Sequence, residues 1–189
     1  MNPNVELVVL VNERNEPIGA APKSAVHTGA TPLHRGCSVF LFRSNGNLLI
    51  QQRARSKATW PLVWSNSCCG HPGVNEDAFA AARRRMKDEL GIVNADIRMM
   101  LPHYRYRAEK DGIVENELCP VMVALSDDPV VPNPDEVEAI EWVPWKEFVA
   151  RIKKDPSWCS PWCNEESALL HDDPAFHRFF AGSIPATRG

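Results

Sequence analysis

The chain has 189 residues, of which 44% are hydrophobic and 24% are charged, and its formal net charge is −3. This composition is typical of a globular protein and excludes a disordered or fibrous chain. The small net charge provides no global attraction to nucleic acid or to an anionic membrane, so we expect neither as a partner. We expect one domain over residues 1–189, with its core at about residues 5–165 and a C-terminal helical extension at residues 166–189.

Targeting segments and disulfide bonds are not expected. The apolar runs are far shorter than the ~20 residues that a membrane-spanning helix needs. The N-terminal residues lack the basic start and apolar centre of a secretory signal, which predicts a cytoplasmic protein. Six cysteines are scattered along the chain, and the adjacent pair Cys68 and Cys69 has poor geometry for a disulfide, so we expect reduced thiols.

The first part of the chain is rich in strand and turn signals. Its valine-rich start predicts a strand over Val5–Asn12, followed by a turn over Asn15–Gly19. Two further apolar runs, Cys37–Phe42 and Leu48–Arg53, flank the turn residues 44–46 and predict a β-hairpin.

The clearest helix is predicted over Ala78–Leu90, because helix formers fill this run and Gly91 ends it. Asn75 is the expected N-cap. An aromatic-rich loop precedes it and leads into Ser67–Pro72, whose Gly and Pro indicate irregular backbone of the kind that often carries chemistry.

The second half predicts a hairpin, one more strand and three short helices. The strands are expected over residues 97–108, 113–125 and 137–143, and the helices over residues 145–152, 163–171 and 176–180. Strands mixed with a few helices indicate an α+β fold with a mixed β-sheet layered between helices.

Arg85 and Glu89 lie four residues apart in the predicted helix and so share one face. By itself this spacing favours a solvated ion pair. The run Arg84–Gly91 also resembles the helix of the NUDIX family, which reads Arg-Glu-apolar-x-Glu-Glu-x-Gly and binds a metal that holds a diphosphate. Arg85 stands where the hydrolases of that family carry a glutamate. The resemblance implies diphosphate binding through a metal on Glu89, and the departure counts against hydrolysis.

Glu115 and Glu117 alternate in a predicted strand, so both carboxylates project from the same face. An isolated pair of this kind usually faces solvent, but it can also share a metal ion or a proton. Three histidines, His27, His34 and His71, lie in predicted loops at spacings that match no compact zinc motif. Together the five residues would form a nitrogen and oxygen set suited to six-coordinate Mn²⁺ or Mg²⁺, and less well to Zn²⁺.

Cys69 precedes a glycine and a histidine in a tight loop. A thiol beside a metal site or a cation is expected to have a lowered pKa, whereas the alternative role is a small buried filler. Cys68 is interpreted as a packing residue.

Five segments together resemble the type I isopentenyl-diphosphate isomerase family, in order from about Val8 to Trp162. The segments are residues 27–34, Asn66–Pro72, Tyr104–Ala108, Gly112–Pro120 and Ser160–Trp162. The resemblance implies a NUDIX-type fold and a 1,3-allylic proton shift that converts isopentenyl diphosphate to dimethylallyl diphosphate through a tertiary carbocation.

By this resemblance Cys69 and Glu117 are the two catalytic acid/base groups, on opposite faces of the substrate alkene. Which of them adds the proton and which removes one stays open. Tyr106 matches a tyrosine that hydrogen-bonds near the glutamate, and Trp162 matches a tryptophan whose π face lies over the developing cation.

The resemblance also implies two metal sites and an anion site. The first metal site would hold Mn²⁺ or Mg²⁺, with Zn²⁺ as an alternative, on His27, His34, His71, Glu115 and Glu117. The second would hold substrate-associated Mg²⁺ on Glu89, with the backbone carbonyl of Cys69 as a further ligand. The substrate diphosphate would be bound by Lys23, Arg53, Lys57 and Arg85. We expect a monomer with a small isoprenoid diphosphate as its partner.

Two alternatives remain at this point. A NUDIX hydrolase would act on a diphosphate substrate, but it is expected to carry a glutamate in place of Arg85. A metal-binding or diphosphate-binding module without activity would have lost a catalytic residue, whereas both Cys69 and Glu117 are present.

Overall fold

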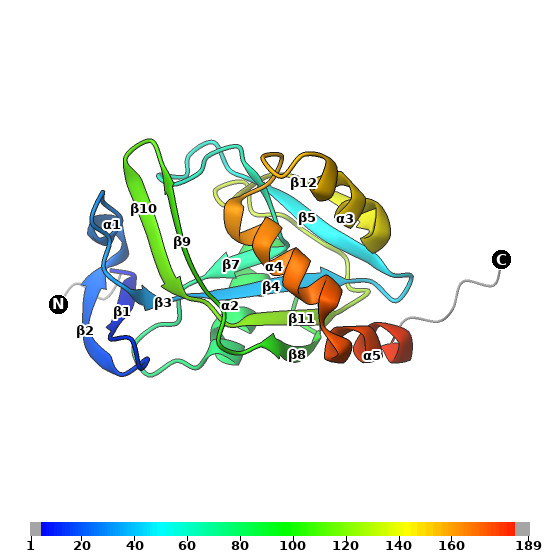
Figure 1. Cartoon of the computed structure of the whole chain (residues 1–189), viewed down its shortest axis with the longest axis horizontal. Helices are drawn as coiled ribbons and strands as arrows, with labels where there is room; N and C mark the ends of the chain where they lie inside the picture. The colour runs from blue at the N-terminus through cyan, green and yellow to red at the C-terminus, as the bar shows by residue number, and fades with distance from the viewer. Residues whose placement is uncertain (1–4, 184–189) are drawn as a thin grey trace.

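The computed structural model describes residues 5–183, which form an α+β fold, as predicted (Figure 1). The strands form two mixed β-sheets, whereas one was expected. The larger sheet has seven strands. Its strands are β12 (Val137–Pro144), β5 (Asn47–Arg53), β4 (Cys37–Phe42), β11 (Val121–Leu125) and β8 (Asp96–Leu101), with β6 (Trp64–Ser65) paired to β5 and β7 (Cys68–Gly70) paired to β4.

Helices cover both faces of the larger sheet. On β4 the side chains of Val39 and Leu41 pack against one face, while Phe40 and Phe42 pack against the other, because successive strand residues point to opposite sides. The first face is covered by α2 (Ala78–Leu90). The second is covered by α3 (Trp145–Lys154), α4 (Pro161–Asp172) and α5 (Pro174–Ser183) (Figure 1). The predicted β-hairpin and the predicted layering between helices are thus confirmed.

The smaller sheet has five strands and lies at the N-terminal end of the molecule (Figure 1). Its order is β2 (Pro17–Pro22), β1 (Leu7–Val11), β3 (His34–Arg35), β10 (Ile113–Leu118) and β9 (Arg105–Lys110). The one-turn helix α1 (Lys23–Val26) follows β2.

The two sheets are joined by two neighbouring parallel chain segments. β3 runs parallel to β10 in the small sheet, and the same segments continue as β4 parallel to β11 in the large sheet. Backbone hydrogen bonds bridge the transition, from Gly36 N to Leu118 O at 2.9 Å and from Ser38 N to Pro120 O at 3.1 Å. Residues on either side of this junction are therefore held in a fixed mutual position.

The predicted long strands over residues 97–108 and 113–125 are wrong in one respect, because each is divided between the two sheets. Pro120 lies at the break between β10 and β11, and its missing N–H makes it a poor ladder residue. The predicted turn over Asn15–Gly19 comes too late: the chain reverses at residues 12–16, with Asn15 at φ 61°, and β2 starts at Pro17.

Two local predictions around α2 also need correction. Ser67–Pro72 is not irregular throughout, because Cys68–Gly70 forms β7 and pairs antiparallel with β4. The N-cap is Asp77, whose carboxylate accepts from Ala80 N at 2.8 Å, whereas Asn75 lies in the left-handed region at φ 66°. The end of the helix at Gly91, with φ 72°, is as predicted.

The C-terminal helix α5 adds packing to the core. Phe176 is buried, with its ring centroid 5.1 Å from that of Trp145 and 5.8 Å from that of Phe42. Residues 184–189 of the expected extension lie outside the described residues. Within residues 5–183 no helix is both long and apolar enough to cross a membrane.

Replacing Asp77 by alanine is expected to lower the free energy of unfolding by about 1 kcal/mol, because the first turn of α2 then loses its cap. Urea denaturation of the wild type and of Asp77→Ala measures the difference. Asp77→Ser keeps a capping oxygen and should retain most of the stability; an equal loss in both variants would contradict the capping role.

Candidate active site

A cavity of about 450 Å³ opens where the two sheets meet α1, α2 and α4. Both sheets contribute polar side chains to it, and the start of α4 contributes an indole ring. Twelve of the thirteen residues that the sequence indicated line this cavity: Lys23, His27, Arg53, Lys57, Cys69, His71, Arg85, Glu89, Tyr106, Glu115, Glu117 and Trp162. The thirteenth, His34, is fully buried and has its Nε2 3.5 Å from Glu117 Oε1.

Three imidazoles converge from separate parts of the chain. His27 ends α1, His34 lies in β3, and His71 follows β7. Their ring centroids are 5.1 to 5.4 Å apart. Taken alone, each histidine could have been an ordinary surface residue, but the fold gathers all three at one point.

Both carboxylates of β10 project toward the imidazoles. Glu115 and Glu117 are 5% and 6% exposed, so the alternative that they simply face solvent is wrong. Glu117 Oε1 lies 2.9 Å from His71 Nε2, and Glu115 Oε2 lies 3.0 Å from His27 Nε2. Burial alone would raise the pKa of Glu117, but the imidazoles of His71 and His34 hold that pKa well below its usual range.

This cluster fits a divalent cation. One ligand atom each from His27, His34, His71 and Glu115 lies within 4.8 Å of the others, as expected for atoms about 2.0 to 2.3 Å from a common centre. His27 Nε2, His34 Nε2 and Glu115 Oε2 are buried and make no hydrogen bond within the described residues. Buried polar atoms that point at one another without hydrogen-bonding require another partner, and a bound cation would provide it.

Glycine is required at the junction of the sheets beside Glu117. A Cβ atom added to Gly36 would lie 2.0 Å from Glu117 Oε2 and 2.8 Å from Glu117 Cδ. Sequence reasoning did not single out Gly36, although an isolated glycine at the start of a strand can indicate such a close approach.

Cys68 and Cys69 face opposite sides of the large sheet. Cys68 is fully buried against α2, where its thiol lies 3.4 Å from Glu89 Oε1, in agreement with its predicted packing role. Cys69 lines the cavity on the α4 side, with its thiol donating to Asn66 Oδ1 at 3.2 Å. The alternation of strand side chains therefore separates a packing cysteine from one that is open to the cavity.

The predicted lowering of the Cys69 pKa is wrong for the protein without bound ions. Burial raises the pKa of Cys69 well above its ordinary value. Cys69 is therefore a neutral thiol in this environment. All six cysteines are free thiols, as predicted.

Arg85 and Glu89 form a buried ion pair, not a solvated one. Arg85 donates to Glu89 Oε1 at 2.7 Å and to Glu136 at 3.0 Å, and Gln51 donates to Glu89 Oε2 at 2.9 Å. Lys57 is paired with the same carboxylate of Glu136. Sequence reasoning missed Glu136 and Gln51, which lie far from α2 along the chain.

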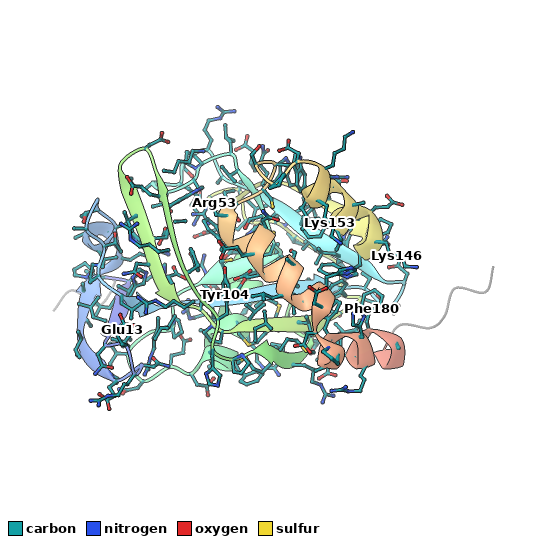
Figure 2. All side chains as sticks on the ribbon, viewed as in Figure 1. Glu13, Arg53, Tyr104, Lys146, Lys153 and Phe180 are labelled. Atoms are coloured by element: carbon teal, nitrogen blue, oxygen red, sulfur yellow. The ribbon has the colours of Figure 1, made fainter. Side chains whose placement is uncertain are left out.

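The remaining cations also have fixed partners. Lys23 lies 3.0 Å from Glu6. The Arg53 guanidinium donates to the backbone oxygens of Thr59 and Trp60, and it lies 5.9 Å from the ring centroid of Trp162, next to the first turn of α4 (Figure 2). These cations line one end of the cavity together with the Arg85 cluster.

Aromatic rings form a further part of the cavity wall, where Trp162 lies beside Arg53. The Trp162 ring centroid lies 5.5 Å from that of Tyr106 and 5.4 Å from that of Trp60, and all three side chains are nearly fully buried. Burial raises the pKa of Tyr106 well above its ordinary value, so its hydroxyl stays protonated. The cavity thus combines a charged end with an apolar, aromatic part.

Comparison with known proteins identifies the family. The NUDIX domain family matches residues 32–163. Proteins named isopentenyl-diphosphate Delta-isomerase are similar over most of the chain. The one from Corynebacterium glutamicum is 48% identical over 86% of this chain and 89% of its own length. The one from Saccharopolyspora erythraea is 44% identical over 88% and 86%, and the one from Clavibacter sepedonicus is 41% identical over 98% and 100%.

Solved structures agree at the level of the fold. A Deinococcus radiodurans protein superposes with a TM-score of 0.68 at 24% identity, over 86% of this chain and 98% of its own. A MutT protein from Methanosarcina mazei gives 0.60 at 14% identity, over 78% and 94%. With the family match and these relatives, the chain belongs to the isopentenyl-diphosphate Delta-isomerase family of NUDIX-domain proteins.

Proposed function

We propose that this protein interconverts isopentenyl diphosphate and dimethylallyl diphosphate by a 1,3-allylic proton shift. The observation that carries the proposal is one cavity that contains a thiol, a carboxylate, an aromatic wall and a cluster of cations. Each of these features matches one requirement of the reaction, and the relatives of this chain carry the name of that activity.

The hydrocarbon part of the substrate needs an acid and a base, because an unactivated alkene is a very weak base. Cys69 and Glu117 supply the two groups from different sheets, so they approach the cavity from different sides. One adds a proton to the alkene and the other removes a proton from C2, which leaves the diphosphate bond intact. Tyr106, next to Glu117 in the β9–β10 pairing, orients the proton at this carboxylate.

The carbocation between the two proton transfers needs a dry environment with electron-rich surfaces. The π face of Trp162 provides the negative side of an aromatic quadrupole, and its neighbours Tyr106 and Trp60 exclude water from the same wall. Water in this place would add to the cation and end the reaction at an alcohol.

The diphosphate would occupy the charged end of the cavity. Lys23, Arg53, Lys57 and Arg85 surround this end, while the overall charge of the chain is −3. Positive charge is therefore concentrated locally where a multiply charged anion needs it. The carboxylates of Glu6 and Glu136 keep the lysines and Arg85 in position until substrate competes for them.

Two cation sites belong to the proposal. The first consists of His27, His34, His71, Glu115 and Glu117, and the mixed nitrogen and oxygen ligands suit Mn²⁺ or Mg²⁺ better than Zn²⁺. The second is Glu89, with Mg²⁺ shared with the substrate diphosphate. Such cations would neutralise buried carboxylates at the first site and diphosphate charge at the second. We also propose that the protein acts as a cytoplasmic monomer.

A NUDIX hydrolase is the second candidate, and Arg85 argues against it. The guanidinium is buried between Glu89 and Glu136. It fills the space and binds the carboxylate oxygens that the several metal ions of a hydrolytic site would need. A binding module without activity would be favoured if a catalytic residue were missing, but both Cys69 and Glu117 line the cavity.

The proposed function is tested by incubating the protein with isopentenyl diphosphate and Mg²⁺ in D₂O. We expect dimethylallyl diphosphate that carries solvent deuterium, without release of phosphate. Phosphate without rearranged product would identify a hydrolase. A folded, metal-loaded protein that gives neither product would support the binding module.

Cys69→Ala and Glu117→Gln are each expected to abolish measurable turnover, because one of the two proton-transfer groups is then missing. Cys68→Ala is the matched control: its side chain faces α2, so turnover should stay within about threefold of the wild type. Product formation is followed by mass spectrometry, and circular dichroism checks the fold. Activity in Cys69→Ala combined with an inactive Cys68→Ala would reverse the assignment of the two cysteines.

Gly36→Ala is expected to lower kcat by about 100-fold, because the added methyl group displaces the Glu117 carboxylate by an ångström or more. Gly182→Ala serves as the control, since a Cβ atom there meets nothing within 4 Å. Steady-state kinetics of both variants measures the effect. Wild-type kcat in Gly36→Ala would show that the exact position of Glu117 is unimportant.

His71→Ala is expected to weaken Mn²⁺ binding at the first site by at least about tenfold, because it removes one of five ligands. Glu89→Gln should leave this site intact, since Glu89 is not one of the five ligands and is paired instead with Arg85 and Gln51. Calorimetric titration with Mn²⁺, without substrate, separates the two. Equal losses in both variants would mean that the two sites are not independent.

A further inference from the structure

One buried acid lies outside the groups described so far, on α4 behind the thiol of Cys69. Glu166 is 0% exposed, and its Oε2 atom lies 2.7 Å from Oγ of Ser38. Its Oε1 atom is buried and has no hydrogen-bond partner among residues 5–183. α4 crosses the face of the large sheet to which Ser38 and Cys69 belong (Figure 1).

The titratable groups with the largest effects on Glu166, and those that Glu166 affects in turn, are all acids. They are Cys69 on β7, Glu117 on β10, Cys119 after β10, Tyr104 before β9, and Cys159, Cys163 and Glu165 on or beside α4. A buried carboxylate without a positive partner is strongly destabilised, whereas a neutral acid needs only a hydrogen bond. Burial among these acids raises the pKa of Glu166 well above its ordinary value. Glu166 is therefore protonated.

The hydrogen bonds of Ser38 depend on that proton. Ser38 Oγ accepts from Asn66 Nδ2 at 2.9 Å, and it lies 3.7 Å from the sulfur of Cys69. The hydroxyl has a single hydrogen to donate. An ionised Glu166 would take this hydrogen. A neutral Glu166 can instead donate its own proton from Oε2 to Ser38, since a proton on Oε1 would meet no acceptor, and the hydroxyl hydrogen is then free.

We propose that Glu166 is a positioning residue that donates its proton to Ser38 and so turns the Ser38 hydroxyl toward the sulfur of Cys69. Ser38 and Cys69 are direct partners in the β4–β7 pairing, so the hydroxyl reaches the sulfur from the same face of the sheet. The hydrogen bond holds the thiol in one rotamer at the cavity wall. The inference rests on the proposed function in one respect, that Cys69 is a reacting group.

Three variants test the positioning role through steady-state kinetics. Glu166→Gln keeps a donor to Ser38, so its kcat should stay within about twofold of the wild type. Glu166→Leu removes the donor, and kcat should fall by about tenfold with KM unchanged, because the thiol is misplaced while substrate binding is not. Glu165→Gln, at the exposed neighbouring position, should behave as the wild type.

Infrared spectroscopy in D₂O tests the proton itself without any turnover. The wild type and Cys69→Ala should both show the carbonyl band of a protonated carboxylic acid at neutral pH, and Glu166→Gln should lack it. An inactive wild type with this band would refute the proposed function alone. Thermal unfolding checks each variant, and if Glu166→Leu does not fold, Ser38→Ala replaces it and must show the same loss in kcat.

Three results would overturn the inference. The first is the absence of the carboxylic acid band in the wild type. The second is a kcat of Glu166→Gln as low as that of Glu166→Leu or Ser38→Ala, because a neutral donor would then be insufficient. The third is a wild-type kcat in a variant that lacks the donor.

Discussion

The parallel chain segments that pass together from the small sheet to the large sheet are the constraint on which the site depends. β3 and β10 bring His34 opposite Glu117, and a few residues later β4 and β11 form the centre of the large sheet. Gly36 and Glu117 approach so closely at this junction that no side chain fits at position 36. Groups on the small sheet are thereby fixed relative to Cys69 on β7, which pairs with β4.

The buried carboxylates and imidazoles at this junction lower the free energy of unfolding when no ligand is bound. Glu115 and Glu117 are buried together, and their partners are imidazoles whose pKa values respond in opposite directions: burial lowers the pKa of His71, whereas Glu117 raises that of His34 against the effect of burial. Buried like charges are tolerated where they bind something, because the bound form recovers the cost of their desolvation. The hydrophobic core on both faces of the large sheet offsets the unfavourable free energy of burying these charges.

The sequence predicted the elements well where the signal is local. The hairpin around residues 44–46 and the end of α2 at Gly91 depend on turn and cap chemistry within a few residues. The division of the long strands between two sheets could not be predicted, because it depends on long-range pairing. The N-cap of α2 was predicted at Asn75, because the left-handed backbone of Asn75 and the capping position of Asp77 are seen only in the structure.

In the candidate site, too, the contacts between distant segments could not be predicted from the sequence. Residue types and the family resemblance were enough to select residues that gather around one cavity, but neither gives the partners that come from distant segments. Glu136, Gln51 and Gly36 have no motif of their own, and each matters only because the fold brings it to an atom of Arg85, Glu89 or Glu117. The lowered pKa expected for Cys69 was wrong for a related reason, since burial of the thiol, which depends on the fold, raises this pKa.

Arg85 shows how one residue can change the reaction that a shared fold supports. A glutamate there would add negative charge beside Glu89 and Glu136, which only further metal ions could balance. Arginine offsets the charge of both carboxylates, so that fewer metal ions are needed, and it also lines the cavity. Under the proposed function, the charged end holds a diphosphate without cleaving it, and the chemistry takes place beside the aromatic rings of Trp162 and Tyr106. Fold similarity to other NUDIX proteins is therefore compatible with a different reaction, because the reaction depends on the residues that the fold positions.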